Sequence, residues 1–582
     1  MILRRASLIP LLSAMAISAQ PSFQGCGPLS ATDFQVTELL NRDGGAKFRD
    51  AQLNEPIGMD FQGTVNPDGS SQVDIYFVQR LGKVRRFNGA SGTVTDLGTI
   101  PVAAKPDAGG DDAGLMGIAL HPDFARNRWI FAWYCPPISA DKIDEMRMRL
   151  SRFTLSPQGT LDMASEKILI DIPGLATHLP EITTDRHPVH DGGPMAFDTH
   201  GDLWVTVGNN GTDLDPAACN VMSATDRHQS GEWGPSNTAS LRGGIFRIRP
   251  DSSAKGYRIP AGNFGEYWAA QFESQGRTTL AAQYRDTAKV APQVYVKGSR
   301  SNFSISVHPT KRWVAWGEVN YASAYDEVDI TAKPMFSGYP YFHADNRKTC
   351  NTMNMDPNAP KNMSPYNTGV TELPPAVPAS VNGLEQVAIA GPIYEYDWRS
   401  ASKSKFPPHL DQSLLSLDFA RNQMWLHTLD TVAVKVKQNT RIDRSLFPDL
   451  RLFGPLQAKY GPDGALYVLN YGSSYYRGQN SGISRIAYKG SCAPVANVPH
   501  GPDPERAGVL LFPERLRVLA PGRHAFSLHD LSGRAILVMA GSAGTEYAWG
   551  RLLKDLGAGP GTYLVRVRTE SGVFEGPISH LH

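Results

Sequence analysis

The stretch Gly461-Pro462-Asp463-Gly464-Ala465-Leu466-Tyr467-Val468-Leu469 joins a tight turn to a short apolar strand. Pro, Asp and Gly are turn formers, and the branched and aromatic residues that follow are typical of a β-strand. The same theme recurs between residues 50 and 490. Six strand segments carry it: Val73–Val78, Trp129–Tyr134, Asp202–Val207, Trp313–Trp316, Gln423–Leu426 and Ala465–Leu469.

The spacing of these segments indicates a repeat. Four-stranded propeller blades need about 40 residues each, and the strands recur at that interval or longer. We therefore expect an all-β chain built on a six-bladed β-propeller, with insertions at residues 209–300 and 340–420 that lie over one face. A two-sheet sandwich is the alternative, although it needs shorter and more even spacing.

Composition agrees with a turn-rich globular protein. The 582 residues include 55 Gly and 43 Pro and are 41% hydrophobic. The 57 basic and 56 acidic residues give a net charge of +1, which argues against an electrostatic surface for nucleic acid or anionic membranes.

The N-terminus predicts export. Arg4 and Arg5 precede the apolar run Leu8–Ile17 and the small residues of Ala16–Ala19, the pattern of a signal peptide over residues 1–20. A buried N-terminal helix is the alternative interpretation. No later segment is long and apolar enough to span a bilayer, so we expect a secreted, periplasmic or cell-surface protein.

The five cysteines cannot all pair with one another, because their number is odd. They are Cys26, Cys135, Cys219, Cys350 and Cys492. A Cys26–Cys492 disulfide would join the two ends of the propeller, whereas an acylated lipoprotein Cys26 is the competing hypothesis.

The C-terminal region reads as a separate module. Residues 494–508 are rich in Pro and polar residues and form the predicted linker after a propeller domain at residues 21–493. Residues 509–582 alternate like strands and predict a small β-sandwich. Leu528–Arg534 and Gly561–Val567 resemble the strand signatures of the C-terminal sorting module of type IX secretion.

Ordered motifs cover nearly the whole predicted propeller. In chain order they are Gly114–Phe124, Leu150–Phe153, His190–Gly193, Leu241–Ile248, Tyr325–Val328, Gly338–Phe342, Asn367–Gly369, Gly391–Tyr394 and Gly461–Tyr467. Together they resemble the glucose/sorbosone dehydrogenase family of soluble quinoprotein sugar dehydrogenases. The resemblance implies a six-bladed propeller that binds PQQ and Ca²⁺ and oxidises a sugar, polyol or related hydroxylated small molecule.

The resemblance places the catalytic base at His190. An imidazole suits this role because it titrates near neutral pH, and Gly192-Gly193 beside it would let backbone approach a planar cofactor. The family orients its histidine with an Asp, whereas this chain has Asn209 at that position. An amide accepts the imidazole proton but adds no charge to stabilise imidazolium, so weaker activity is expected.

The resemblance also implies the cofactor-binding residues. Arg300 matches the family arginine beside quinone and substrate, and Ser301 replaces an Asn next to it. Arg242 lies in a motif whose lysine is Gly244 here, and Asp112 precedes the turn where quinone contacts occur.

Calcium in the family is held partly by backbone carbonyls of a Gly-Pro pair that this chain lacks. The corresponding carbonyls here belong to Asn320 and Tyr321. Glu318, Asp326 and Glu327 offer further hard oxygen donors close in sequence.

Two other functions stay open. Changes at several chemical positions beside intact turn motifs are also typical of a non-catalytic propeller that binds extracellular carbohydrate or protein through Tyr339, Tyr341, Trp398 and Tyr475. A calcium-dependent lactonase-type hydrolase is the third candidate. The sequence identifies neither the substrate nor the electron acceptor.

Overall fold

The computed structural model divides the chain into two compact units, which we describe separately. One comprises residues 28–490, and the other contains the described residues of 1–27 and 491–582. The structure describes residues 23–24, 27–104, 113–137, 147–173, 190–210, 234–320, 326–349, 354–383, 386–397, 399–473, 478–490, 492–494, 509–512, 515–519, 522–530, 535–558, 561–569 and 572–580.

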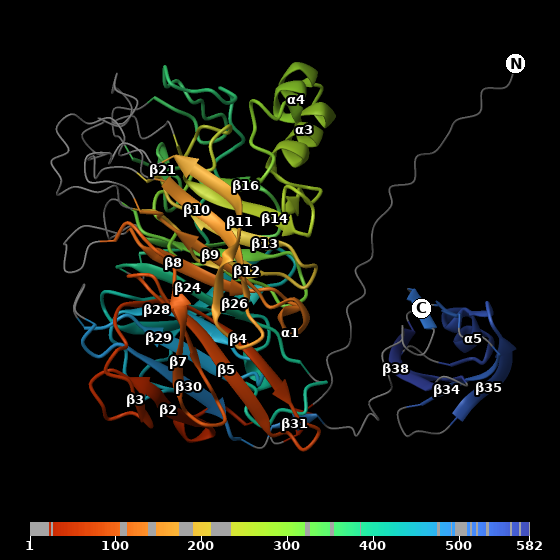
Figure 1. Cartoon of the computed structure of the whole chain (residues 1–582). Helices are drawn as coiled ribbons and strands as arrows, with labels where there is room; N and C mark the ends of the chain where they lie inside the picture. The colour runs from red at the N-terminus through yellow and green to blue at the C-terminus, as the bar shows by residue number, and fades with distance from the viewer. Residues whose placement is uncertain are drawn as a thin grey trace, which may run out of the picture. The chain divides into compact units, whose positions relative to one another are not determined.

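Residues 28–490 form the predicted six-bladed propeller, in which each blade is an antiparallel sheet with a core of four strands (Figure 1). The first blade contains β4 (Pro56–Val65), β5 (Ser71–Gln79), β6 (Lys83–Phe87) and β7 (Val94–Thr99). The second contains β8 (Leu115–Leu120), β9 (Trp129–Tyr134), β10 (Arg147–Leu155) and β11 (Leu161–Pro173). The third contains β12 (Met195–Phe197), β13 (Leu203–Val207), β14 (Gly244–Pro250) and β16 (Val294–Lys297).

The remaining blades repeat this order. The fourth contains β17 (Ser306–Val307), β18 (Val314–Glu318), β19 (Glu327–Thr331) and β23 (Val381–Asn382). The fifth contains β24 (Ala388–Tyr394), β25 (Ser413–Asp418), β26 (Gln423–Asp430) and β27 (Lys435–Arg441). The sixth contains β28 (Pro455–Tyr460), β29 (Leu466–Asn470), β30 (Gly482–Tyr488) and, from the start of the unit, β2 (Phe34–Asn41).

The N-terminal strand β2 closes the ring. It pairs with β30 from Phe34↔Tyr488 to Asn41↔Gly482, and the two strands lie side by side as red and blue arrows in Figure 1. The short β3 (Phe48–Arg49) adds to the outer edge of the same sheet. The sixth blade therefore contains both ends of this unit.

Blades pack against one another through large side chains. Trp133 on β9 faces Phe246 on β14 with ring centroids 6.0 Å apart, which joins the second and third blades. The fully buried Trp204 and Trp316 lie in one apolar cluster between the third and fourth blades. A blade buries both of its faces only when a neighbour covers each one.

Two insertions carry the other elements of this unit. Between β14 and β16 the chain forms β15 (Tyr257–Arg258), α3 (Phe264–Ser274) and α4 (Thr278–Arg285). Between β19 and β23 it forms β20 (Met335–Phe336), β21 (Phe342–His343) and β22 (Arg347–Lys348). The predicted insertions at 209–300 and 340–420 are too long, because the first also contains the blade strands β14 and β16 and the second contains β24 and β25. The elements α3 and α4 and residues 336–376 share one apolar core. A one-turn helix, α1 (Phe124–Asn127), precedes β9.

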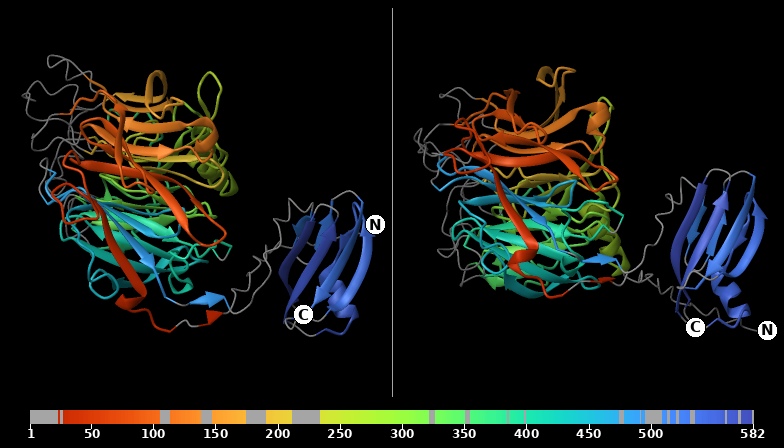
Figure 2. Two further views of the ribbon diagram at one scale, coloured as in Figure 1. Left: turned by 60° about the horizontal axis from the view of Figure 1, so that its bottom comes forward. Right: turned by 90° about the horizontal axis from the view of Figure 1, so that it is seen from below.

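The C-terminal unit is the predicted small β-sandwich (Figure 2). One sheet contains β32 (Val509–Phe512), β33 (Arg515–Val518) and β36 (Glu546–Tyr547). The other contains β34 (Arg523–His529), β35 (Ala535–Ser542), β37 (Gly561–Thr569) and β38 (Gly572–His580), and α5 (Trp549–Asp555) follows β36. Phe526 stacks on Tyr547 at 4.1 Å between centroids and joins the two sheets.

The cysteine hypotheses are only partly within the described residues. Cys135 is free and buried, and Cys492 is disulfide-bonded. β1 (Phe23–Gln24) pairs with β31 (Ala493–Pro494) beside Cys492. Cys26 lies outside the described residues, so the Cys26–Cys492 pairing stays a prediction. The structure contains no helix, among the residues it describes, that is long and apolar enough to cross a membrane.

Ring closure predicts that the core of β2 is essential to the whole propeller. Leu40 is 1% exposed on β2, so Leu40→Ala is expected to cost about 2–5 kcal/mol of unfolding free energy. Calorimetry of the full chain should show a lower midpoint for the propeller transition. Gln35→Ala, at an exposed position of the same strand, is the control and should change it little. Equal shifts for the two variants would contradict the prediction.

Candidate active site

Three of the predicted catalytic residues meet at one mouth of the propeller. His190 precedes the inner strand β12, Asn209 follows β13, and Arg300 precedes β17. The imidazole Nδ1 of His190 lies 2.8 Å from Oδ1 of Asn209, and the backbone N–H of Asn209 donates to the carbonyl of Arg300 at 2.7 Å. The third and fourth blades are thus joined at the site itself.

The His190–Asn209 contact sets the imidazole tautomer. An amide oxygen only accepts hydrogen bonds, so Nδ1 of His190 carries the proton and Nε2 keeps its lone pair. Burial, followed by the positive charge of Arg300, lowers the pKa of His190 to about 3, and the hydrogen bond that His190 donates to Asn209 opposes this only in part. His190 is therefore a neutral imidazole at physiological pH.

The backbone around His190 is held in an uncommon conformation. His190 has φ of 65° and Asn210 has φ of 51°, both in the left-handed region that non-glycine residues seldom adopt. The buried Asp191 fixes this segment, because its carboxylate accepts hydrogen bonds from Asn210 Nδ2 and from the Cys135 thiol at 3.5 Å. Its carbonyl also accepts a bond from the Trp133 indole at 3.0 Å. Local strain of this kind is often retained at functional sites.

The paired glycines after His190 are required by tight packing against other parts of the protein. A side chain at Gly192 would lie 2.5 Å from the carbonyl oxygen of Thr206, and one at Gly193 would lie 2.5 Å from Met116 Cβ. Their φ values of 72° and 121° also disfavour other residues. Gly192 and Gly193 allow close packing of backbone against β13 and β8, and the close neighbours are protein atoms.

Arg300 is almost buried, at 7% exposure. Its guanidinium Nη1 donates to the carbonyl of Val319 at 3.0 Å, and its backbone N–H donates to Glu318 Oε1 at 2.6 Å. The positive charge is therefore held beside His190 by groups at the end of β18.

A buried lysine that the sequence analysis missed supports the neighbouring loop. Lys297 lies directly opposite Gly244 in the β14–β16 ladder, where the resemblance implies that a lysine is lost. Its ammonium is fully buried and donates to the carbonyls of Gly234 at 2.8 Å, Ser240 at 3.0 Å and Arg242. The opposite strand thus supplies a lysine at this register position, and Gly244 is the signal that could have pointed to it.

The other predicted cofactor residues are placed as follows. Arg242 is 2% exposed, and its Cβ and the Asn209 carbonyl both lie close to Gly234. Ser301 accepts the Val319 N–H at 2.9 Å through its carbonyl, one residue from Arg300. Asp112 lies outside the described residues.

The residues predicted to ligate calcium lead to a cluster of carboxylates. Asn320 donates its backbone N–H to Asp326 at 2.8 Å, and Tyr321 lies outside the described residues. Glu318, Glu327 and Asp329 lie close by on β18 and β19, and their carboxylate oxygens are all within 4.8 Å of one another. We call these three residues the carboxylate triad.

The β-ladder explains the carboxylate triad. Glu318 pairs with Glu327 across the two strands, and Asp329 lies two residues further along β19, on the same face. Each is no more than 2% exposed, and within the described part of the chain Glu318 Oε2 and Asp329 Oδ2 have no hydrogen-bond partner. The sequence analysis named Glu318 and Glu327 as donors, whereas it missed Asp329, although the i, i+2 spacing of Asp329 from Glu327 was a signal.

Electrostatics in the carboxylate triad fit a divalent cation. Burial first, then neighbouring carboxylates, raise the pKa of Glu318 to about 8 and that of Glu327 well above its usual value, and burial raises that of Asp329 to about 7. Burial also raises the pKa of nearby Asp326 to about 9. Buried carboxylates with unbonded oxygens are the hard donor set that Ca²⁺ prefers.

Comparison with known proteins confirms the resemblance over part of the chain. Residues 53–258 match the model of the glucose/sorbosone dehydrogenase family. Over 206 residues the chain is 26% identical to quinoprotein glucose dehydrogenase B of Acinetobacter calcoaceticus, a match that spans 35% of this chain and 38% of the relative. The match therefore spans less than half of that protein.

Solved structures of sugar dehydrogenases match this chain at low identity. A glucose dehydrogenase of Thermus thermophilus described as a putative oxidoreductase matches 78% of this chain and 99% of its own, at 18% identity and a TM-score of 0.48. The PQQ-bound aldose sugar dehydrogenase of Streptomyces coelicolor matches 79% and 99%, at 16% identity and a TM-score of 0.46. Similarity at this distance carries no information about the activity of this chain.

The Asn209 contact predicts how the His190 pKa responds to charge. Asn209→Asp places a carboxylate 2.8 Å from Nδ1, which stabilises imidazolium and is expected to raise the pKa of His190 from about 3 by at least one unit. NMR titration of labelled histidine would measure the change. The control is Asn439→Asp, because Asn439 makes the same 2.8 Å contact with His427 in the fifth blade. That variant should leave His190 unchanged, and a His190 pKa that stays low in Asn209→Asp would contradict the assignment.

The carboxylate triad predicts stabilisation by calcium. A hundredfold excess of Ca²⁺ over its Kd should add about 2.7 kcal/mol to the unfolding free energy. Calorimetry with calcium and with a chelator would detect it as a higher midpoint for the propeller transition. Asp329→Asn should remove most of the difference between the midpoints with calcium and with chelator. The control variant Asp430→Asn, on β26 and outside the triad, should retain this difference. A calcium effect that is equal in both variants would show that the ion binds elsewhere.

Proposed function

We propose that the propeller is a quinoprotein dehydrogenase that oxidises a sugar, polyol or related hydroxylated small molecule. The observation that carries the proposal is the meeting of His190, Asn209 and Arg300 at one mouth, where Glu318 of the carboxylate triad accepts the backbone N–H of Arg300. The family match over residues 53–258 supports it.

The residues of the site would divide the chemistry between them. Oxidising a C–H/O–H carbon removes one proton and one hydride. The lone pair on His190 Nε2 accepts the hydroxyl proton, while Asn209 holds the ring in the required tautomer. Arg300 stabilises negative charge that develops on oxygen. Bound PQQ would accept the hydride, and electrons would then pass to an external acceptor.

The residues present fit PQQ and calcium. PQQ is a planar polyanion, and the nearly buried guanidinium groups of Arg242 and Arg300 are suited to its carboxylates and quinone oxygens. Glu318, Glu327 and Asp329 would hold the calcium ion, and Asn320 lies next to them in sequence.

A low pKa makes His190 a weak base. The family's Asp at the position of Asn209 would raise that pKa, so we expect a modest rate whose acid limb lies near pH 3, where His190 becomes protonated. Asn209→Asp should move this limb to higher pH.

The binding-protein alternative has less support in the described residues. Tyr339 and Tyr341 are 4% and 0% exposed, so neither offers an open ring face for a ligand. Trp398 and Tyr475 lie outside the described residues. PQQ titration separates the two functions, because a propeller with a lost site would not bind the quinone.

Export completes the proposal. Residues 1–20 would direct the chain out of the cytoplasm, and the C-terminal sandwich would act as a sorting module of the type IX kind. Support comes from the signal-like N-terminus and from the two motifs: Gly561–Val567 lies on β37, whereas Leu528–Arg534 begins at the end of β34 and continues outside the described residues.

The test is dye-linked oxidation of aldoses and polyols by the full chain after addition of PQQ and calcium. His190→Ala should lower kcat at least about a hundredfold, since general bases contribute that much or more, and should leave PQQ binding in place. His409→Ala, an exposed histidine of the fifth blade, is the matched control and should retain full activity. Absence of PQQ binding to the wild-type chain would overturn the proposal, and unchanged turnover in His190→Ala would overturn the choice of base.

A further inference from the structure

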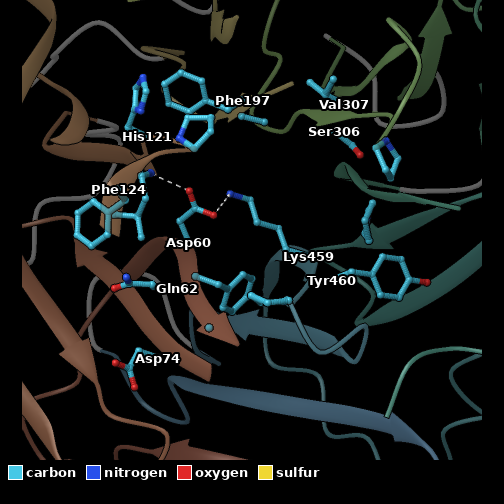
Figure 3. Close-up of a pocket in the computed structure, with 18 of the residues that line it drawn as sticks. Asp60, Gln62, Asp74, His121, Phe124, Phe197, Ser306, Val307, Lys459 and Tyr460 are labelled. Carbon is cyan, nitrogen blue, oxygen red and sulfur yellow. Dashed lines mark hydrogen bonds and ion pairs between the residues drawn. The ribbon is translucent and has the colours of Figure 1, made fainter. Parts of the chain in front are cut away.

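A cavity lies on the propeller axis, at the mouth opposite His190. It has a volume of about 770 Å³ and is lined by residues of the innermost strand of every blade: β4, β8, β12, β17, β24 and β28 (Figure 3). These residues occupy the C-terminal parts of the strands, whereas His190 and Arg300 precede the N-terminal ends of β12 and β17. The cavity is within the usual size range of small-molecule sites.

An apolar constriction separates the two mouths. Ile57, Met116, Met195 and Leu456 belong to the earlier parts of the same strands and surround a space of only about 10 Å³. A cavity of this size holds at most about one water molecule. A ligand in the larger cavity therefore cannot reach His190, and the two mouths are separate sites.

A loosely bonded ion pair lies at the centre of the cavity. Asp60 Oδ2 accepts the backbone N–H of Leu120 at 2.8 Å, and Oδ1 lies 3.4 Å from the ammonium of Lys459, as Figure 3 shows. The side chains are 24% and 16% exposed, so both groups are largely desolvated yet still reach the cavity. A charge-assisted hydrogen bond is usually about 2.7–2.9 Å long. The contact between Asp60 and Lys459 is longer than this, so both groups can still form hydrogen bonds with a ligand.

Among the described residues, the Lys459 ammonium contacts only Asp60, which leaves two of its three protons for a ligand. Gln62, on the same strand as Asp60, makes no hydrogen bond through its amide within the described part of the chain and faces the same cavity. One wall of the cavity thus presents a hydrogen-bond donor on Lys459, an acceptor on Asp60 and an amide on Gln62 that can act as either.

The rest of the cavity carries no net charge and has both polar and apolar walls. Arg86 neutralises the charge of Asp74, and Lys459 neutralises that of Asp60. These pairs leave no net charge that would favour an ionic ligand. Phe197 and Tyr460 contribute aromatic surface, with prolines and aliphatic residues between them. Adjacent donors and acceptors beside apolar ring surfaces match a molecule that has vicinal hydroxyls on one side and C–H groups on the other.

We propose that this cavity is a second, non-catalytic binding site for a neutral saccharide of one or two rings. Adjacent hydroxyls would accept from Lys459 and donate to Asp60, Gln62 would bond a further hydroxyl, and Phe197 would pack on a ring face. The site is independent of the oxidation proposed above, because it shares no residue with the other mouth.

The experiment is isothermal titration of the full chain, without PQQ and with a chelator, using glucose and maltose as probes. Glycine and citrate test the zwitterionic and anionic classes. Saccharide should bind wild type and His190→Ala equally, and Lys459→Met should bind at least about tenfold more weakly. Lys435→Met, an exposed lysine on β27, is the matched control and should bind as wild type.

Gln62→Ala is a second test in case Lys459→Met does not fold. The Gln62 side chain makes no hydrogen bond within the described residues, so the variant should keep the thermal midpoint and still bind saccharide more weakly. The proposal is overturned if Lys459→Met and Gln62→Ala both bind saccharide like wild type. It is equally overturned if His190→Ala abolishes binding, if neither saccharide binds, or if citrate or glycine binds in preference.

Discussion

The pairing of β2 with β30 is the contact on which the rest of the propeller depends. A single blade has two apolar faces and cannot bury either one alone, so the six sheets are stable only as a closed ring. Residues 34–41 close it by adding the fourth strand of the sixth blade. Both axial mouths owe their geometry to this closure, because each is built from groups that different blades contribute.

The ring also explains how chemistry can be placed at its ends with little help from regular structure. His190, Asn209 and Arg300 lie on connections, yet the bond from Asn209 N–H to the Arg300 carbonyl fixes two blades against each other at that point. The carboxylate triad lies near Arg300 on two paired strands, and the pairing of β18 with β19 sets the spacing of its three side chains. Rigid strands thus hold the groups whose charges would otherwise repel, and the connections carry the groups that face a ligand.

Sequence reasoning anticipated the fold well because strand and turn are local properties. Five of the six strands chosen by their residue pattern are the second strand of a blade, and only β26 is the third of its blade. The site was anticipated less completely. Sequence motifs pointed to His190, Asn209 and Arg300. The pairing of Lys297 with Gly244 across two strands was missed, because a single sequence does not show which strands pair. The glycines after His190 were assigned to cofactor approach because the sequence does not reveal which backbone lies next to them.

Closure by the first strand has a consequence for biosynthesis. β2 emerges early from the ribosome, but its partner β30 ends at Tyr488, so the barrier to ring formation contains the loop-closure entropy of nearly the whole unit. A nascent chain stays open until almost all of it has been made. Until residue 488 has been made, such a polypeptide can pass through a narrow pore without first having to be unfolded.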